Sequence, residues 1–300
     1  MSSPTKELVV IVGPTASGKT DFAIRLAQRH VTEIVSADSV QIYRRFDLGT
    51  GKPSPEQRAQ VPHWLIDVAE PLEPMDAARW AELAAAQIQV IHARGRRAIV
   101  CGGSFLWILA LLFGLAPAPP ADTEVRARHR GVVESRGRQA LHAELLAVDP
   151  SSAQRLSPND TMRVSRALEV FELTGTPMSR WQAEHGFRQP RYRYRLIGIA
   201  LERSELDARI CARVKSMLDA GWIQEVQGLL SQGFRRARAM GSVGYRQIAE
   251  ALESSAPIDV DKLSDAIYRA TRRFARRQRT WLRDQPVEWV PRESAETLVL

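Results

Sequence analysis

The sequence predicts an α/β fold in which helices flank a parallel sheet and an all-helical segment is inserted into the chain. Short apolar runs rich in Val and Ile recur through the first hundred residues and again near residue 196. Helical patterns separate these runs, and only helical patterns occupy 122–186. Strands that alternate with helices form parallel sheets covered on both faces.

Composition limits the class of protein. The chain has 300 residues, of which 44% are hydrophobic and 25% charged, as expected for a globular protein of one large domain or two moderate ones. Its formal net charge of +8 exceeds what an enzyme acting on small anions needs, so a polyanionic partner is expected.

The cysteines, the start of the chain and the length of its apolar runs indicate a compartment. Cys101 and Cys211 lack the spacing of a metal site, and we expect both to be reduced, mostly buried thiols. The chain enters its first strand without a signal peptide, which predicts a cytoplasmic protein. The longest apolar run, 105–113, is too short to cross a bilayer, so no membrane partner is expected.

The first strand leads into a phosphate-binding motif. Residues 8–12 are apolar and mostly β-branched, and 21–29 continue as a helix. Between them the pattern G-x-x-x-x-G-K-[ST] predicts a P-loop, because its backbone N–H groups and the helix dipole attract phosphate. Lys19 would reach the terminal phosphates, and the Thr20 hydroxyl would ligate Mg²⁺. The predicted di- or triphosphate site consists of Gly13, Pro14, Thr15, Ala16, Ser17, Gly18, Lys19 and Thr20.

Three more strands are expected before residue 105, at 33–39, 64–67 and 97–101. A helix is expected at 76–94, with an apolar side made of Trp80, Leu83, Ala84, Gln87, Ile88 and Ile91. Polar side chains follow the strands at Asp38, Asp67 and Ser104. Ligands bind at the carboxyl ends of parallel strands, so at least three strand ends, the P-loop included, are expected around one cleft.

A proline-rich tether at 114–122 marks a domain boundary. Beyond it, helices are expected at 125–135, 139–148, 160–173 and 178–185. The chain returns to a strand at 196–201. We therefore expect a P-loop NTPase-like core made of 1–116 and 190–300, and a helical insertion domain of 117–189.

The C-terminal third is expected to be helical with one edge strand. A capping box at 204–207 would open a helix on which Arg209 and Arg213 share a face. Further elements are expected at 222–232, 261–283 and 286–291, the last of them a strand.

The long helix is strongly basic, with seven Arg and no acid in 269–283. Phe274, Gln278 and Trp281 are expected to face the core. A basic ridge would consist of Arg269, Arg272, Arg273 and Arg276. This imbalance favours an external phosphate backbone over an ordinary solvated face.

Eight blocks of the sequence occur in one known family in the same order. They are GPTASGKT at 13–20, SADSVQIY at 36–43, GTGK at 49–52, GGS at 102–104, PND at 158–160, RVSRALEV at 163–170, VGYRQ at 243–247 and RRQRTWL at 276–282. On these blocks the chain closely resembles the tRNA dimethylallyltransferases, or isopentenyltransferases, which prenylate the adenine 3′ of the anticodon.

The resemblance implies an activity. A dimethylallyl group would pass from dimethylallyl diphosphate (DMAPP) to N6 of adenosine 37, in tRNAs that read codons beginning with U, and diphosphate would leave. The adenosine would be flipped out of the anticodon stem-loop into a channel. Displacement would be direct, with allylic cation character, Mg²⁺ as cofactor and no consumption of ATP. A monomer suffices for this geometry.

The resemblance also implies residue roles. Asp38 matches the base, and Ser104 stands where Thr is usual. With Lys19, Arg209 would neutralise the leaving diphosphate, and Arg213 is a reserve candidate on the same face. The implied tRNA contacts are Asp38, Ser39, Val40, Gln41, Ser104, Arg126, Met162, Arg163, Val164, Ser165, Arg166, Gly241, Ser242, Val243, Gly244, Tyr245, Arg246, Arg276, Arg277, Gln278, Arg279, Thr280, Trp281 and Leu282.

Other interpretations stay open at this point. Asp38 could cap a helix, and Arg166 and Tyr245 could serve in packing or ion pairs. A small-molecule kinase would use Asp38 as base and Asp67 to hold metal, but it would not explain the Arg-rich helix. A non-catalytic RNA-binding module would explain the charge and leave Lys19 without a role. Whether ATP also enters the P-loop is open.

Overall fold

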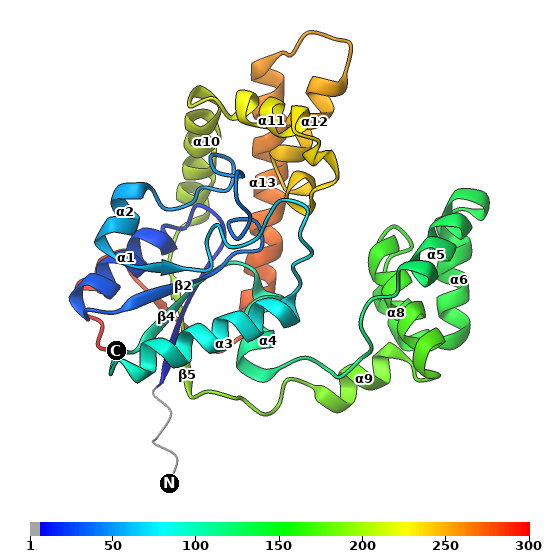
Figure 1. Ribbon diagram of the computed structural model, residues 1–300, viewed down its shortest axis with the longest axis horizontal. Helices are drawn as coiled ribbons and strands as arrows, with labels where there is room; N and C mark the ends of the chain where they lie inside the picture. The colour runs from blue at the N-terminus through cyan, green and yellow to red at the C-terminus, as the bar shows by residue number, and fades with distance from the viewer. Residues whose placement is uncertain (1–6) are drawn as a thin grey trace. The chain divides into compact units, whose positions relative to one another are not determined.

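The computed structural model describes residues 7–300, which divide into two compact units (Figure 1). The core unit consists of 7–112 and 191–300, and the helical unit consists of 113–190. Among the described residues, none of the helices combines the length and the hydropathy that a transmembrane span requires.

The core unit contains a six-stranded parallel sheet in the order β3-β2-β4-β1-β5-β6. Its strands are β1 Leu8–Val12, β2 Glu33–Ala37, β3 His63–Trp64, β4 Ala98–Gly102, β5 Tyr194–Ile199 and β6 Val287–Val290. β1 lies at the centre, with Val10 opposite both Val100 and Leu196. Every residue of β1, β2 and β4 is buried. The predicted parallel sheet, flanked by helices, is confirmed.

Helices flank the sheet (Figure 1). The core unit contains α1 Lys19–Arg29, α2 Pro55–Gln60, α3 Ala77–Ala93, α4 Phe105–Phe113, α10 Arg203–Asp219, α11 Trp222–Ser231, α12 Tyr245–Glu253 and α13 Val260–Arg283. Short 3₁₀ helices are η1 Phe234–Arg236, η2 Arg238–Gly241 and η3 Arg292–Glu296. Helices α1 and α3 pack against strands of the sheet. Phe22 and Leu26 of α1 pack with Val9, Ile11 and Ile99 on one face of the sheet.

Several elements differ from the sequence-based expectation. The strand expected at 64–67 ends after Trp64, because Leu65 and Asp67 adopt positive φ angles of 63° and 58° and turn the chain. The expected capping box at 204–207 is wrong: α10 begins at Arg203, two residues earlier than a Ser204 cap would give, and its N-cap is Glu202. Leu83, expected on the apolar side of α3, is 38% exposed. Phe274, expected to face the core, is 37% exposed, and Cys211 is exposed rather than buried. Helices α2 and α12 were not expected.

The helical unit is built of five helices, one more than expected. They are α5 Thr123–Arg136, α6 Arg138–Val148, α7 Pro150–Arg155, α8 Thr161–Thr174 and α9 Met178–His185. The unexpected α7 starts with a proline and is capped by Asp149, whose carboxylate accepts a hydrogen bond from the Ser152 N–H. The apolar core of this unit centres on Leu141, Leu145, Ala153, Val164, Ala167 and Leu168.

Candidate functional site

The P-loop follows β1 and presents an uncapped helix N-terminus. Gly18 lies in the left-handed region at φ 86°, which suits glycine, and α1 starts there without a side-chain cap. The Lys19 ammonium donates to the Pro14 carbonyl at 3.3 Å. Burial lowers the pKa of Lys19, while the nearby Asp38 carboxylate opposes the shift. The fully buried Ser17 hydroxyl has no hydrogen-bond partner among residues 7–300.

A cavity of about 300 Å³ lies against the P-loop. Its lining comes from α1, α2, α10 and the loop that follows β2, and consists of Ala16, Gly18, Lys19, Thr20, Asp21, Gly51, Lys52, Pro53, Gln57, Arg213, Ser216 and Met217. We call it the P-loop cavity. Two of its cations, Lys19 and Arg213, come from segments far apart in the sequence, so the fold assembles a positively charged site for an anion.

Arg213 enters this cavity through a space that only glycine leaves open. A Cβ on Gly51 would lie 1.9 Å from a guanidinium nitrogen of Arg213, and φ at Gly51 is +60°. The guanidinium donates to the Thr50 carbonyl at 3.3 Å, and burial lowers its pKa. Arg209 does not line this cavity and pairs with Glu205 at 2.9 Å, but its guanidinium lies beside the P-loop, 3.2 Å from where a Cβ on Gly18 would be. Of the two candidate arginines, the structure places Arg213 in the cavity.

Asp38 and Ser104 meet at the ends of β2 and β4. One Asp38 oxygen accepts the Val40 and Gln41 N–H groups at 2.9 and 3.2 Å, which leaves the other oxygen free of partners among residues 7–300. The Ser104 hydroxyl oxygen accepts the Ser39 N–H at 2.9 Å. Residues 39–43 form turns and not a helix, so Asp38 is not a helix cap. The ends of β2 and β4 therefore lie side by side, although neither Asp38 nor Ser104 is among the residues that line the P-loop cavity.

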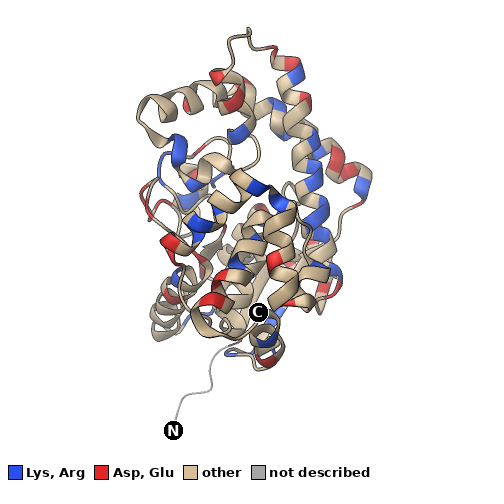
Figure 2. Ribbon diagram, turned by 90° about the vertical axis from the view of Figure 1, so that its right-hand side faces the viewer, with Lys and Arg blue, Asp and Glu red and all other residues tan. Residues whose placement is uncertain are grey.

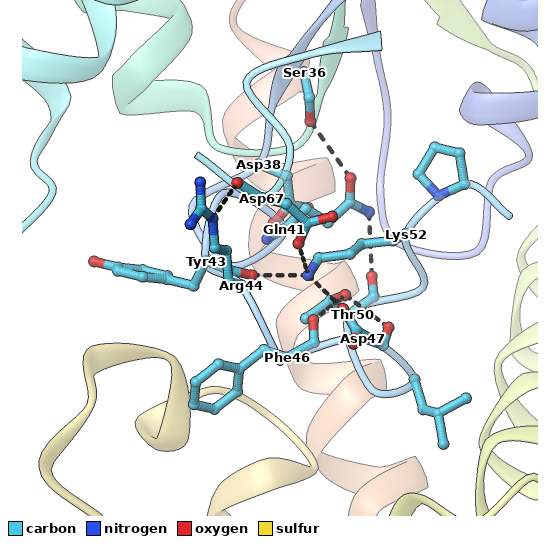
Figure 3. A network of polar contacts seen from close by, with 12 residues as sticks. Ser36, Asp38, Gln41, Tyr43, Arg44, Phe46, Asp47, Thr50, Lys52 and Asp67 are labelled. Carbon is cyan, nitrogen blue, oxygen red and sulfur yellow. Dashed lines mark hydrogen bonds and ion pairs between the residues drawn. The ribbon is translucent and has the colours of Figure 1, made fainter. Parts of the chain in front are cut away.

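The loop after Asp38 is held by a polar network (Figure 3). Gln41 donates to the Thr50 and Gly51 carbonyls at 3.2 and 3.1 Å. The Gln41 amide is therefore used to stabilise Thr50 and Gly51, the second of which lines the P-loop cavity.

Lys52 is the cation of this network. It donates to the Tyr43 carbonyl and to the carboxylates of Asp47 and Asp67. Arg58 pairs with the second oxygen of Asp67 at 2.8 Å. Burial alone would raise the pKa of Asp67, but the hydrogen bonds from Lys52 and Arg58 lower it. Both oxygens of Asp67 are thus engaged by cations, which speaks against its role as the metal-holding acid of a kinase.

Gln278 connects the long helix α13 to the P-loop. Its side-chain oxygen accepts the Thr15 N–H at 2.8 Å, and its side-chain nitrogen donates to the Gly103 carbonyl at 3.1 Å. Only 6% of Gln278 is exposed, as expected from its apolar stripe. Trp281, one turn on, stacks on Phe105 with ring centroids 4.1 Å apart. Two residues expected at RNA are therefore turned toward the protein.

The opposite side of α13 borders a second cavity of about 940 Å³. We call it the arginine groove after seven of its lining residues, Arg203, Arg269, Arg272, Arg273, Arg276, Arg279 and Arg283. Arg272 pairs with Asp207, whereas the guanidinium groups of Arg203, Arg273, Arg276 and Arg279 have no partner among residues 7–300. Figure 2 shows the basic residues spaced along α13, which descends from the top of the view. Pro14 also lines the groove, so the P-loop lies between the two cavities.

The block around Tyr245 packs inside the core unit. The Tyr245 hydroxyl donates to Glu225 and accepts the Gly49 N–H at 3.2 Å, and the side chain has no exposed surface. Trp222 lies against Gly49 and Gly244, where any Cβ would clash with its ring. Of the expected RNA contacts here, Arg246 is exposed and Tyr245 is not.

In the helical unit as well, some of the expected RNA contacts are exposed and others are buried. Met162 is 78% exposed and Arg163 is also at the surface, whereas Val164 is buried in the apolar core. Arg126 and Arg166 both bind Glu169.

Sequence reasoning missed the residues that support the site from behind. Trp222 packs against Gly49, and Glu225 accepts a hydrogen bond from the Leu48 N–H. Lys52 donates to the Tyr43 carbonyl in the same loop. The one available signal was the glycine pair in GTGK, since glycines often mark a close approach of a side chain.

Comparison with known proteins shows which family this sequence and fold belong to. A model of the family "IPP transferase" matches residues 41–285. A tRNA dimethylallyltransferase of Sorangium cellulosum is 61% identical over 284 residues, covering 95% of this chain and 90% of that protein. One from Geobacter sulfurreducens is 45% identical over 290 residues, covering 96% and 92%.

Solved structures show the same likeness. The full-length tRNA isopentenylpyrophosphate transferase of Bacillus halodurans is 36% identical with a TM-score of 0.69, covering 95% of this chain and 90% of that one. A eukaryotic dimethylallyltransferase acting on tRNA shares the fold, with a TM-score of 0.80 at 23% identity, covering 96% and 74%. A family match over most of the chain and relatives of this identity lead to one conclusion: the chain belongs to the IPP transferase family.

Proposed function

We propose that this protein transfers a dimethylallyl group from DMAPP to N6 of adenosine 37 in tRNAs that read codons beginning with U. The observation that carries the proposal is the placement of Asp38 and Ser104 beside the cationic P-loop cavity. Asp38 is near enough to Lys19 and Arg213 to oppose the lowering of the pKa of both. A carboxylate thus stands next to a diphosphate-sized anion site, as alkylation of an amino nitrogen that must lose a proton requires.

The P-loop cavity would hold the diphosphate of DMAPP. Lys19, the free N–H groups at the start of α1 and Arg213 would receive its charge, and Ser17 supplies an unused buried hydroxyl. We prefer Arg213 to Arg209 for this contact because Arg213 lines the cavity and Arg209 is paired with Glu205. Pre-organised cations of this kind stabilise charge that develops on a leaving group.

Mg²⁺ fits the residues present. Thr20 and Asp21 line the P-loop cavity, and residues 7–300 contain no cluster of three or more His, Cys, Asp or Glu side chains able to hold a metal. Mg²⁺ commonly takes one or two protein oxygens and completes its shell with phosphate and water. Thr20 would therefore hold an ion that arrives with the diphosphate, where Mg²⁺ neutralises phosphate charge.

The chemistry follows from the two strand ends. The free oxygen of Asp38 would accept the N6 proton as the N6 lone pair forms a bond to C1 of the dimethylallyl group. The C1–O bond breaks and its electrons leave with diphosphate. The Ser104 oxygen already accepts the Ser39 N–H, so its own proton is available to orient the substrate near the reacting atoms.

The RNA would be bound by cationic surfaces on each unit. In the core unit, the arginine groove includes guanidinium groups, those of Arg203, Arg273, Arg276 and Arg279, that have no partner among residues 7–300, which suits a phosphate backbone. The helical unit, proposed as the insertion domain of 117–189, would grip the anticodon stem-loop with Met162, Arg163 and neighbours. The buried residues Val164 and Tyr245 would contribute through packing. We propose a monomer that acts in the cytoplasm.

One assay tests the activity. Purified protein is mixed with labelled DMAPP, Mg²⁺ and unmodified tRNA bearing adenosines at positions 36 and 37. Label should move onto tRNA without added nucleotide. Transfer of a γ-phosphate to a metabolite would instead support the kinase alternative, and RNA binding without turnover the non-catalytic module.

A variant tests the base. Asp38→Ala should abolish transfer while tRNA affinity falls only modestly. Asp47→Asn removes an exposed carboxylate of the same loop and should keep most activity. Near-normal turnover of Asp38→Ala would refute the assignment.

A further inference from the structure

A buried carboxylate in the helical unit binds two arginines at once. Glu169, on α8, has no exposed surface. Arg126 of α5 donates to both of its oxygens, through Nε at 2.8 Å and through Nη2 at 3.0 Å. Arg166, one turn before Glu169, donates to the second oxygen. Both guanidinium groups therefore lie beside a single carboxylate.

The arrangement leaves positive charge at the surface. One carboxylate cannot balance two guanidinium groups, so the three side chains carry a net charge of +1. The side chains of Arg126 and Arg166 stay 39% and 27% exposed. Burial would raise the pKa of Glu169, but the hydrogen bonds from Arg126 and Arg166 lower it, so the carboxylate is ionised at neutral pH.

The two arginines are also fixed in orientation. Arg126 is bound by two parallel hydrogen bonds, the geometry that aligns a guanidinium plane with a carboxylate. Arg166 has a second anchor, the Pro119 carbonyl, at 2.6 Å. The Asp122 N–H donates to Glu169 at 2.7 Å, so the start of α5 is tied to the same group. A phosphate meets donors whose side-chain freedom has already been lost, which favours binding.

Glu172, the next acidic residue of α8, offers a contrast. It pairs with Arg128 and with His129 and is 35% exposed, and the Arg128 side chain is 61% exposed. It links the same two helices, α5 and α8, and carries the same charge. An exposed pair of this kind orders its arginine weakly. Glu172 is therefore a matched control for Glu169.

We propose that Glu169 is a positioning residue for tRNA binding, which holds Arg126 and Arg166 side by side so that together they grip one phosphate of the RNA. This inference rests on the proposed function, since it presumes that the helical unit binds tRNA. It predicts an effect opposite to that of simple electrostatics. Removing a negative charge should strengthen the binding of a polyanion, whereas removing a positioning group should weaken it.

The test compares Glu169→Gln with Glu172→Gln, which raise the net charge equally. The dissociation constant for tRNA is measured between 50 and about 200 mM salt, alongside KM for DMAPP and helix content by circular dichroism. We expect Glu169→Gln to bind tRNA about tenfold more weakly, equivalent to ~1.4 kcal/mol. Its salt slope should fall by ~0.7–0.9, the value of one lost phosphate contact. KM for DMAPP should not change, and Glu172→Gln should bind as the wild type does or more tightly.

A second variant covers the case in which Glu169→Gln loses helix content. The double change Arg126→Lys and Arg166→Lys keeps all charges and an ion pair to Glu169, but it removes the planar fork. It too should weaken tRNA binding about tenfold, or ~1.4 kcal/mol. Unchanged or tighter binding by Glu169→Gln, or wild-type binding by the double lysine variant, would overturn the inference. Wild-type protein that binds no tRNA would overturn the proposed function and this inference with it.

Discussion

Replacing Gln278 by Met should uncouple α13 from the P-loop. Met keeps most of the side-chain volume but neither hydrogen bond, so the Thr15 N–H and the Gly103 carbonyl lose their partners. Two partly buried groups left unsatisfied at ~1–3 kcal/mol each, with some access to water, give a loss of about 2–4 kcal/mol in the free energy of unfolding. For a domain of 150–250 residues this lowers Tm by roughly 4–16 °C.

The same variant should also lose activity, because Thr15 belongs to the P-loop and Gly103 precedes Ser104. A displacement of about 1 Å at reacting groups can cost about 10² in rate, so we expect kcat to fall on that scale while the enzyme stays folded below its Tm. Thr280→Ala, on the same helix, removes a hydroxyl that bonds only within α13 and should change stability by less than about 0.5 kcal/mol. A Gln278→Met protein with wild-type Tm and kcat would refute this reasoning.

Three further predictions concern the P-loop cavity and its support. Lys19→Met should abolish diphosphate binding in calorimetry. Because burial lowers the pKa of Lys19, the wild type loses stability as pH falls below about 10.4 toward the lowered folded pKa, and this slope should vanish in the variant. Gly51→Ala should weaken diphosphate binding about tenfold, by ~1.4 kcal/mol, because its Cβ displaces Arg213. Tyr245→Phe should cost ~1–3 kcal/mol in urea unfolding, because one oxygen of the half-buried Glu225 loses its donor while the other keeps the Leu48 N–H.

Controls and contrary outcomes are available for each. Gly95→Ala has a similar positive φ but nothing within 4 Å of the added Cβ, so it isolates backbone strain. Equal diphosphate affinities for Gly51→Ala and Gly95→Ala would contradict the prediction that a Cβ at position 51 displaces Arg213. Burial raises the pKa of Glu225, so wild-type stability should fall as pH rises through that folded pKa. Tyr245→Phe should extend this fall to higher pH, and an unchanged profile would contradict the pairing. A pH slope that persists in Lys19→Met would assign it to another group.

The sheet and most helices could be predicted because their signals are local. Continuous apolar runs identified the buried strands, and α9 begins and ends where its periodicity indicated. The expected capping box failed because an N-cap contributes only about 1 kcal/mol, too little to decide the start of α10 at Arg203. The prediction that Leu83 is buried was wrong because the buried stripe of α3 consists of Trp80, Ala84, Ile88 and Ile91, and Leu83 lies at its margin.

In the candidate site, too, local features could be predicted and contacts between distant segments could not. The P-loop could be read from the chain because one short segment supplies its backbone and cation. The supports could not, because Gln278 reaches Thr15 across 263 positions and Glu225 reaches Leu48 across 177. A buried polar side chain shows in sequence only as an interruption of an apolar stripe, and the pattern does not name its partner.

The central position of β1 determines the order in which its neighbouring strands become available during synthesis. Val10 pairs with Val100 on one side and with Leu196 on the other, and the entire helical unit is encoded between those two neighbours. The five helices thus emerge, with their own apolar core, while β1 still presents an open strand edge to its surroundings. Synthesis must pass residue 213 before Arg213 can close the P-loop cavity, so an unfinished chain lacks this part of the anion site.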